Sequence, residues 1–414
     1  MAKINRIGML SVHGYFDPVP ILGATDTGGQ VTYVIELSKC LAELGPKVDI
    51  YTRRFGDRSE VEAVNDDVRV IRIRAGNNEF IRKEDLFPHL DEFTDNMSAY
   101  IDQNGLDYEL LHSHYWDAGY VAMNLSERMG VPFIHTAHSL GAWKKEQMGG
   151  DPEEMEKLFK FTERVHWENI IYRRATAQTV TTQDGMDNYK RLYDFESPDL
   201  VIIPPGVDTK RFRPLEPGER DRDLDAPAKF IFALSRIDSN KGLDYLIRGF
   251  AKIHGKTDAD LVIGGGSKNP KPHEIEVKRS LEDLVESQGV RDRVKFTGYV
   301  PDELLDSYYR RAQVFVLPSK YEPFGMTVLE AMGCGTAVVA TRLGGIRHVL
   351  HDKKDSLLVD PSDADELGAA LQSILTDRKL ASSLASAGLE LIRSTFSWES
   401  IAGRTLEFYK RYVP

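Results

Sequence analysis

Residues 321–331 read YEPFGMTVLEA, a stretch that follows a short apolar run and turns into a helical pattern near Met326. Gly325 lets the backbone come close to a ligand, and the free N–H groups at the helix start favour an anion there. Glu330, two helical turns after Glu322, can accept hydrogen bonds from a neutral diol beside that anion. An anion next to a sugar diol describes a nucleotide-sugar. The alternative is an ordinary strand–loop–helix unit with two solvated glutamates.

The rest of the chain alternates short apolar runs with helical patterns, as in a parallel sheet covered by helices on both faces. The pattern predicts strands in the first half at residues 7–12, 48–52, 68–73, 109–112, 133–136, 179–182 and 200–203. It predicts strands in the second half at residues 229–234, 260–263, 294–297, 314–317, 337–340 and 357–359. We therefore expect an α/β chain built from two doubly wound halves of similar size.

Residues 213–227 separate the two halves, because they are rich in proline and charge and lack apolar periodicity. A chain of 414 residues exceeds what one core usually supports. We expect one domain over 1–212, a linker over 213–227 and a second domain over 228–395. Residues 396–414 predict a final amphipathic helix that packs back on the first domain. Facing domains of this kind bind ligands where the carboxyl ends of their strands meet.

The composition narrows the partners of the chain. A net charge of −11 argues against a general nucleic-acid binder, and no window approaches 18 uninterrupted apolar residues, so no membrane span is predicted. Cys40 and Cys334 lie far apart without metal-type spacing, and the N-terminus has no apolar stretch long enough for a signal peptide. These features favour a reduced, cytoplasmic location.

Two glycine-rich turns follow predicted strands. Gly28-Gly29-Gln30 lies between the first strand and the first helix, and Gly264-Gly265-Gly266-Ser267 follows a strand of the second half. Each permits a tight turn and a close ligand approach, but neither forms the full dinucleotide fingerprint. A plain strand–helix turn remains the alternative for both.

Two histidine pairs also follow strands, His112 with His114 and His135 with His138. Zinc would need four ligands, and no nearby cysteine or carboxylate completes either set. We therefore expect no metal and interpret the histidines as hydrogen-bond donors to a sugar, with buried structural histidines as the alternative.

Two basic residues follow the first predicted strand of the second half. Arg236 and Lys241 can converge on one diphosphate, because arginine offers a planar fork and lysine a point charge. With Asp238 nearby, a surface ion pair is the alternative.

Together these segments resemble the retaining glycosyltransferases of family four, and within them the branch of mannosylfructose-phosphate and sucrose-phosphate synthases. The resemblance spans nearly the whole chain and implies the GT-B fold, two facing Rossmann-like domains with an active-site cleft between them. The first domain would bind the acceptor and the second the nucleotide-sugar. The resemblance is carried by residues 22–31 (LGATDTGGQV), 114–119 (HYWDAG), 138–141 (HSLG), Arg236 with Lys241, and 322–327 (EPFGMT) with Glu330.

The resemblance also implies residue roles. Arg236 and Lys241 would neutralise the leaving phosphate, His138 would contact the donor sugar, and Glu322 would hold sugar hydroxyls. Together these four form the implied catalytic set. The implied donor-binding residues are Gly29, Gly264, Phe324, Gly325, Met326, Thr327 and Glu330, of which Glu330 would bind the ribose. The implied acceptor-binding residues are Gly29, Gln30, Lys83, His114, Lys144 and Arg164. Lys145 and the Arg173-Arg174 pair are neighbours that could substitute for the last two, and each cation could instead be a solvated helix charge.

The implied reaction is transfer of a hexose, with retention, from GDP-mannose or UDP- or ADP-glucose to fructose 6-phosphate. The product would be a non-reducing disaccharide phosphate, mannosylfructose-phosphate or sucrose-phosphate, which a separate phosphatase would then process. No cofactor is expected beyond the nucleotide-sugar co-substrate. The alternatives are a sucrose-synthase-like transferase acting on free fructose, a nucleotide-sugar 2-epimerase on the same fold, and a catalytically dead binder.

Overall fold

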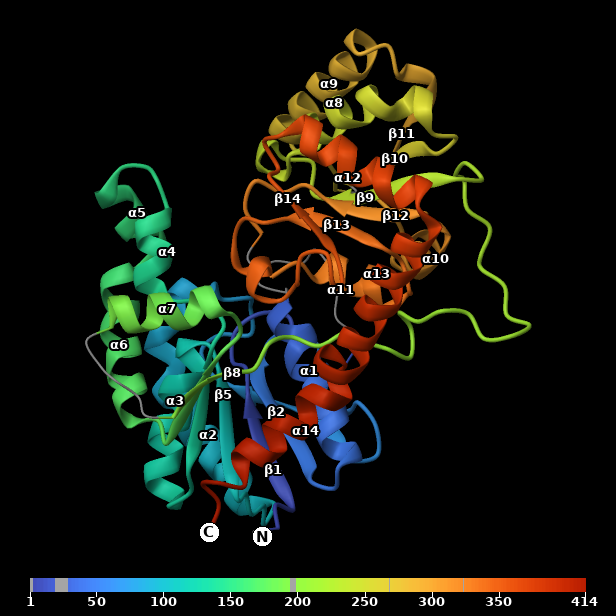
Figure 1. The fold of residues 1–414 in the computed structure, drawn as a ribbon. Coiled ribbons are helices and arrows are strands. Elements are labelled where there is room, and N and C mark those ends of the chain that lie inside the picture. Colours follow the sequence, from blue (N-terminus) through green and yellow to red (C-terminus); the bar gives the residue numbers. More distant parts are fainter. Residues whose placement is uncertain (1–2, 19–28, 194–198, 268, 323) are drawn as a thin grey trace. The chain divides into compact units, whose positions relative to one another are not determined.

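The computed structural model describes residues 3–18, 29–193, 199–267, 269–322 and 324–414 (Figure 1). The chain forms two compact units. The first unit combines Met1–Gly206 with Trp398–Pro414, and the second is Val207–Ser397. In the described residues, no helix is both long enough and apolar enough to cross a bilayer.

The first unit is built on a sheet that has eight strands in the described residues, in the order β3-β4-β2-β1-β5-β6-β7-β8. All neighbours pair in parallel except β3, which runs antiparallel to β4. The strands are β1 (Arg6–Leu10), β2 (Lys47–Arg54), β3 (Val61–Ala63), β4 (Val68–Arg74), β5 (Leu110–His114), β6 (Phe133–Ala137), β7 (Ala177–Val180) and β8 (Leu200–Ile202).

Helices cover both faces of this sheet, because its central strands are buried on both sides and leave no face for water. α1 and α14 pack on one face, whereas α2, α3, α6 and α7 pack on the other. The helices are α1 (Gly29–Glu43), α2 (Leu90–Gln103), α3 (Trp116–Met129), α4 (Gly141–Gln147), α5 (Pro152–Phe159), α6 (Phe161–Arg174), α7 (Gln183–Leu192) and α14 (Trp398–Tyr409). Short 3₁₀ turns are η1 (Lys83–Asp85) and η2 (Phe87–His89). In Figure 1 the red α14 lies beside the blue α1, so the two ends of the chain share one core.

The second unit is built on a parallel sheet that, in the part of the chain described, has six strands in the order β11-β10-β9-β12-β13-β14. The strands are β9 (Phe230–Ser235), β10 (Asp260–Gly265), β11 (Val294–Gly298), β12 (Val314–Leu317), β13 (Val338–Thr341) and β14 (Leu357–Val359). The helices are α8 (Leu243–Ile253), α9 (Pro272–Ser287), α10 (Leu305–Arg311), α11 (Met326–Gly333), α12 (Ala364–Thr376) and α13 (Arg378–Leu391). Short turns are η3 (Ser239–Lys241), η4 (His254–Lys256), η5 (Arg291–Arg293), η6 (Asp302–Leu304), η7 (Gly345–His348) and the π-helical η8 (Ile392–Phe396). Helices α8, α9, α12 and α13 enclose one core of this unit, and α10 and α11 enclose the other.

The segment 213–227 contains no helix or strand and belongs to the second unit. Arg310 of α10 holds it through Asp221, at 2.7 Å, and Arg213 pairs with Glu219, also at 2.7 Å. In both units the parallel strands bring their carboxyl ends, and the loops that follow them, to one edge of the sheet.

Candidate active site

The turn after β9 positions the first candidate cations. Asp238 caps η3 by accepting a hydrogen bond from the Asn240 backbone N–H at 3.1 Å. Gly242 follows with φ +64°, and a Cβ atom there would lie 1.9 Å from the Pro318 carbonyl oxygen. Only glycine therefore lets this turn pack against the end of β12, which brings Lys241 next to the loop after that strand.

Lys241 forms an ion pair across this contact. Its Nζ lies 3.1 Å from Oε2 of Glu322, and only 14% and 15% of the two side chains are exposed. Among the residues that the structure describes, neither cation pairs with Asp238, whose carboxylate caps the turn. Arg236 is exposed, and within the described residues its guanidinium makes no hydrogen bond or ion pair. One cation is thus held by a carboxylate, whereas the other is open to a ligand.

The loop after β12 leads into the start of α11. Gly325 has φ +86°, and a Cβ atom there would meet Ile346 at 2.3 Å. Phe324 is buried against the ring of Phe396, with 6.1 Å between centroids. As the first residues of the helix, Met326 and Thr327 have backbone N–H groups without helical partners. An anion is therefore stabilised at this end of α11.

Glu330 lies within α11, where burial raises the pKa of its carboxyl group to about 7. Oε2 accepts a hydrogen bond from the Tyr309 hydroxyl at 2.8 Å. The remaining lone pairs can accept hydrogen bonds from a ligand diol.

A pocket of about 500 Å³ opens at the carboxyl ends of β10 and β11. The loop beside it is fixed by Glu274, which accepts a hydrogen bond from the Ser267 backbone N–H at 2.6 Å. Gly264 is packed beneath the pocket, where a Cβ atom would meet Val300 at 2.8 Å. The apolar part of the wall, suited to a flat ring, comes from Ile237, Ile263, Ile275, Phe296 and Tyr299, and the glycine part from Gly265, Gly266 and Gly298.

In the first unit, the candidate histidines lie at the ends of β5 and β6. His138 is half-buried and its Nε2 lies 2.9 Å from Nδ1 of His114. Burial lowers the pKa of His138 to about 3, so the ring is neutral at ordinary pH. His114 is fully buried, and its other nitrogen contacts the Met9 sulfur at 3.5 Å. From this position His114 reaches a ligand only through His138.

The two remaining histidines are internal. His112 bonds to the hydroxyls of Tyr409 and Thr136, and His135 bonds to Ser113. Both are buried, as the structural alternative in the sequence analysis stated. Within the described residues, no three or more His, Cys, Asp or Glu side chains gather in a way that could hold a metal ion.

The start of α1 borders this site. Gly29 is exposed at the first position of the helix. Gln30 donates from Nε2 to Ser11 Oγ at 3.0 Å and to the His114 carbonyl at 3.2 Å. The preceding motif, residues 22–28, lies outside the described residues, as do Lys268 and Pro323.

The three expected acceptor cations lie on separate elements. Lys83 begins η1, with its Nζ 3.8 Å from Glu84, and Lys144 of α4 lies 4.6 Å from the centroid of the Phe159 ring. Arg164 of α6 is buried; it donates to Glu168 at 2.8 Å and to the Ser139 carbonyl at 2.6 Å.

Arg164 keeps its charge in this position. Burial lowers the pKa of its guanidinium, but Glu168, through its charge and its hydrogen bond, outweighs this effect together with the nearby Tyr115 and Tyr172, and the pKa is raised above the ordinary value.

Tyr115 is a residue of this region to which sequence reasoning assigned no role. It has φ +76° and ψ 162°, a conformation almost confined to glycine that costs on the order of 1–3 kcal/mol. The Arg164 guanidinium lies over its ring at 4.7 Å. Asp117, two residues later, holds His13 at 2.6 Å. Only the quoted HYWD motif hinted at these contacts, because the strained φ has no sequence signature.

Comparison with known proteins identifies the family to which the chain belongs. Residues 27–211 match the family described as Glycosyltransferase Family 4, and residues 219–390 match Glycosyl transferases group 1. The chain is 41% identical to mannosylfructose-phosphate synthase of Agrobacterium fabrum, over 98% of this chain and 91% of that protein. The chain belongs to glycosyltransferase family 4. As a member of this family it is a glycosyltransferase, which confirms the expected enzyme class.

Two further proteins that resemble this glycosyltransferase support the same family assignment. The chain is 33% identical to D-inositol 3-phosphate glycosyltransferase of Corynebacterium urealyticum, over 98% of this chain and 95% of that one. Sucrose-phosphate synthase from Thermosynechococcus elongatus superposes with a TM-score of 0.74 at 32% identity, covering 98% of each chain. With the two parallel-sheet units, this match confirms the predicted GT-B fold.

Proposed function

We propose that this glycosyltransferase moves a hexose, with retention, from a nucleotide-sugar to fructose 6-phosphate. The observation that carries the proposal is Lys241, held 3.1 Å from Glu322 beside the start of α11, with the Arg236 guanidinium open nearby in sequence. This arrangement suits a diphosphate leaving group. Stabilising charge where it develops is usually the largest single term in catalysis.

The donor occupies the second unit in this proposal. Its base enters the pocket of about 500 Å³ beside Tyr299, and its ribose diol donates to Glu330. The diphosphate meets the N–H groups at Met326 and Thr327 together with the two cations. The carboxylate of Glu322, oriented by Lys241, accepts hydrogen bonds from the sugar hydroxyls.

The proposed transfer reaction needs no nucleophile from the protein. The acceptor hydroxyl oxygen attacks the anomeric carbon on the face that the diphosphate leaves. The bond from that carbon to the phosphate oxygen breaks, and its electron pair stays on the phosphate. The proton of the acceptor hydroxyl passes to that phosphate oxygen. Neutral His138, Gly29 and Gln30 are the residues of the first unit that the proposal assigns to the reacting groups.

The acceptor occupies the first unit. Lys83 and Lys144 bind its phosphate, and Arg164, anchored by Glu168 and the Ser139 carbonyl, supplies charge from the rear. The names of these three relatives support a phosphorylated acceptor or product, since each name refers to a sugar or inositol phosphate. A separate phosphatase in the same cytoplasm then consumes the product.

A donor and acceptor panel tests the proposal. GDP-mannose, UDP-glucose and ADP-glucose are each incubated with fructose 6-phosphate, fructose, inositol 3-phosphate or no acceptor, and products are identified by mass spectrometry. We expect one donor to give a disaccharide phosphate with fructose 6-phosphate and almost nothing with fructose. A product from free fructose would favour a sucrose-synthase-like enzyme. Conversion of a donor without any acceptor, into an epimer, would overturn transferase function.

A further inference from the structure

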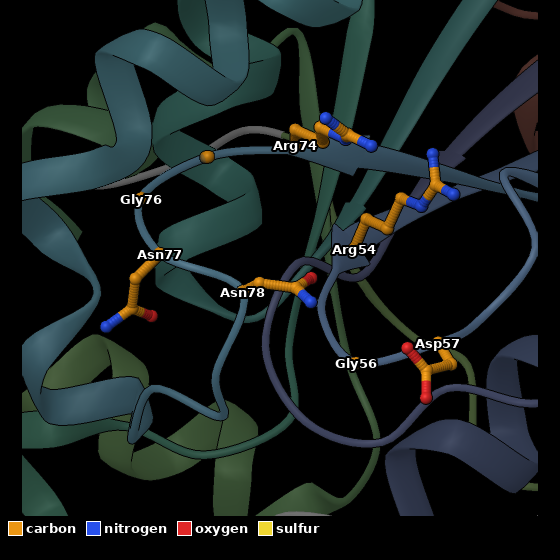
Figure 2. A pocket seen from close by; sticks show the side chains of 8 residues that line it. Arg54, Gly56, Asp57, Arg74, Gly76, Asn77 and Asn78 are labelled. Carbon is orange, nitrogen blue, oxygen red and sulfur yellow. The ribbon is translucent and has the colours of Figure 1, made fainter.

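A second pocket in the first unit takes no part in the proposed reaction. It has a volume of about 560 Å³ and opens at the carboxyl ends of β2 and β4 (Figure 2). Open α/β sheets bind ligands at this edge. The pocket is lined by Arg54, Gly56, Asp57, Arg74, Ala75, Gly76, Asn77 and Asn78.

Two arginines stand side by side in its wall. Arg54 and Arg74 are the last residues of their strands and are direct partners in the parallel register. Paired residues on neighbouring strands lie about 4.8 Å apart, and like charges in such a pair destabilise the sheet unless an anion compensates them. The two positions therefore gather positive charge at one point of the sheet edge.

The arginines are only partly satisfied by the protein. Arg54 lies 3.3 Å from Glu60 and donates from Nε to the Arg58 carbonyl at 3.2 Å. Arg74 is exposed, and in the part of the chain that the structure describes its guanidinium makes no hydrogen bond or ion pair. Its five N–H donors are thus open to a ligand.

The loop that forms the facing wall is held rigidly. Buried Arg53 donates to the carbonyls of Ala75 at 2.7 Å, of Glu79 at 2.8 Å and of Asn77. Gly76 has φ +67°, and a Cβ atom there would meet the His89 ring at 2.9 Å. Because one buried guanidinium binds three carbonyls, the loop keeps one shape before any ligand arrives.

Polar groups from the two loops complete the pocket. Figure 2 shows the Asn78 carboxamide, on the loop after β4, turned toward Arg54, and the Asp57 carboxylate on the loop after β2, whereas Asn77 points away. The carboxamide can donate to an anion, and the carboxylate can accept from a hydroxyl. Because one carboxylate lines the same pocket as two arginines, the pocket favours a ligand that carries both an anionic and a hydroxyl end.

We propose that this pocket binds the phosphate group of a small ligand, with Arg74 and Arg54 as its forked donors. The ligand is either free phosphate or a phosphorylated polyol, which would add a hydroxyl contact to Asp57. Planar guanidinium groups suit phosphate, since they offer two parallel N–H donors to its oxygens. The proposal is independent of the acceptor assignment, because Lys83 lies outside the lining of this pocket.

Calorimetric titration at low salt tests the site, with inorganic phosphate and fructose 6-phosphate as separate probes. The variants are Arg74→Gln, Arg54→Gln with Arg74→Gln, and Lys83→Ala. The matched control is Arg128→Gln, another surface arginine of the first unit, which pairs with Asp95. Arg74 has no side-chain partner to lose, so its single variant should fold even if the double variant does not.

We expect the Arg74→Gln variant to weaken phosphate binding about tenfold or more at one site, with Arg128→Gln unchanged. Lys83→Ala should leave that site intact, which separates this proposal from the acceptor pocket. Tighter binding of fructose 6-phosphate, lost in Asp57→Asn, would identify a phosphorylated polyol, whereas equal binding of both probes would identify free phosphate. An unchanged titration in Arg74→Gln, or an equal loss in Arg128→Gln, would overturn the site.

Discussion

Lys241 and Glu322 lie 81 positions apart in the chain, yet Nζ of the lysine is 3.1 Å from Oε2 of the glutamate. The family resemblance implied separate roles for the two residues: Lys241 would contact the leaving phosphate and Glu322 the sugar hydroxyls. Because they form an ion pair, each side chain holds the other in position. The carboxylate fixes the position of the cation, and the cation orients the largely buried carboxylate.

The leaving-group contacts predict a loss of turnover. Lys241→Ala or Arg236→Ala should lower kcat by about 100-fold or more, because each removes a transition-state charge contact of a few kcal/mol. Donor binding should weaken much less. Lys252→Ala, which removes only an exposed ion pair with Asp365, is the control. Steady-state kinetics with near wild-type kcat would remove the mutated residue from the mechanism.

The contact between the two residues predicts non-additive mutational effects. Residues that act as one unit share their losses. The double variant Lys241→Ala with Glu322→Gln should therefore lose clearly less activity than the product of the two single losses. Independent losses in this cycle would show that the ion pair has no catalytic meaning.

The pKa of Glu330 predicts how donor affinity depends on pH. Because burial raises this pKa to about 7, the carboxylate that accepts from the ribose is present above pH 7 and lost below it. Donor affinity should fall by about tenfold between pH 8 and pH 6. Calorimetry with an intact nucleotide-sugar measures this, since its diphosphate does not titrate there. Glu330→Gln should flatten the profile, and a pH-independent wild type would contradict the ribose contact.

The acceptor cations predict selectivity for a phosphorylated sugar. Each charge-assisted contact contributes about 1.5–3 kcal/mol, so two or three give on the order of a thousandfold preference for fructose 6-phosphate over fructose. Lys83→Ala should raise the acceptor KM while donor hydrolysis stays nearly intact. Lys410→Ala, which removes an ion pair with Glu407 in α14, serves as the control. Equal kcat/KM for the two acceptors would refute the proposed binding of the acceptor phosphate by Lys83, Lys144 and Arg164.

The leaving-group mechanism also predicts that activity survives exhaustive EDTA treatment, because the cations of the protein replace a metal ion. Activity lost on chelation and restored by one specific divalent ion would contradict it.

Gly242 predicts a stability effect. Gly242→Ala forces a side chain into φ +64° and into the Pro318 carbonyl, so unfolding free energy should fall by at least about 2 kcal/mol. Gly255→Ala, in the same unit with nothing within 4 Å of the added atom, should change it by less than about 0.5 kcal/mol. Urea titration compares the two.

The fold could be predicted because its signal is local. Apolar runs mark strands that are buried on both faces, and most expected strands differ from the observed ones by one or two residues, as at β7, expected at 179–182 and found at Ala177–Val180. Strand β3 was not predicted, because Val61–Ala63 is exposed throughout and has no apolar pattern. It forms only by pairing with β4.

The site was only partly predictable, because its decisive contacts join distant residues. The ion pair of Lys241 depends on how Gly242 packs on Pro318, and the internal role of His112 depends on Tyr409, 297 positions away. The residue types alone indicated that Lys241 and His112 were candidates for a functional site. Only the packed chain shows which of them face a ligand and which face each other.

Helix α14 completes the core of the first unit, although it is synthesised after the second unit. On the ribosome, residues 3–206 must wait, with Val31 and Ile35 of α1 uncovered, until Trp398 and Ile401 emerge. At about 5–20 residues per second this interval lasts on the order of 10–40 s. The second unit can fold meanwhile. Synthesis therefore reverses the usual order, so that the domain begun first matures last and exposes its apolar face to chaperones in between.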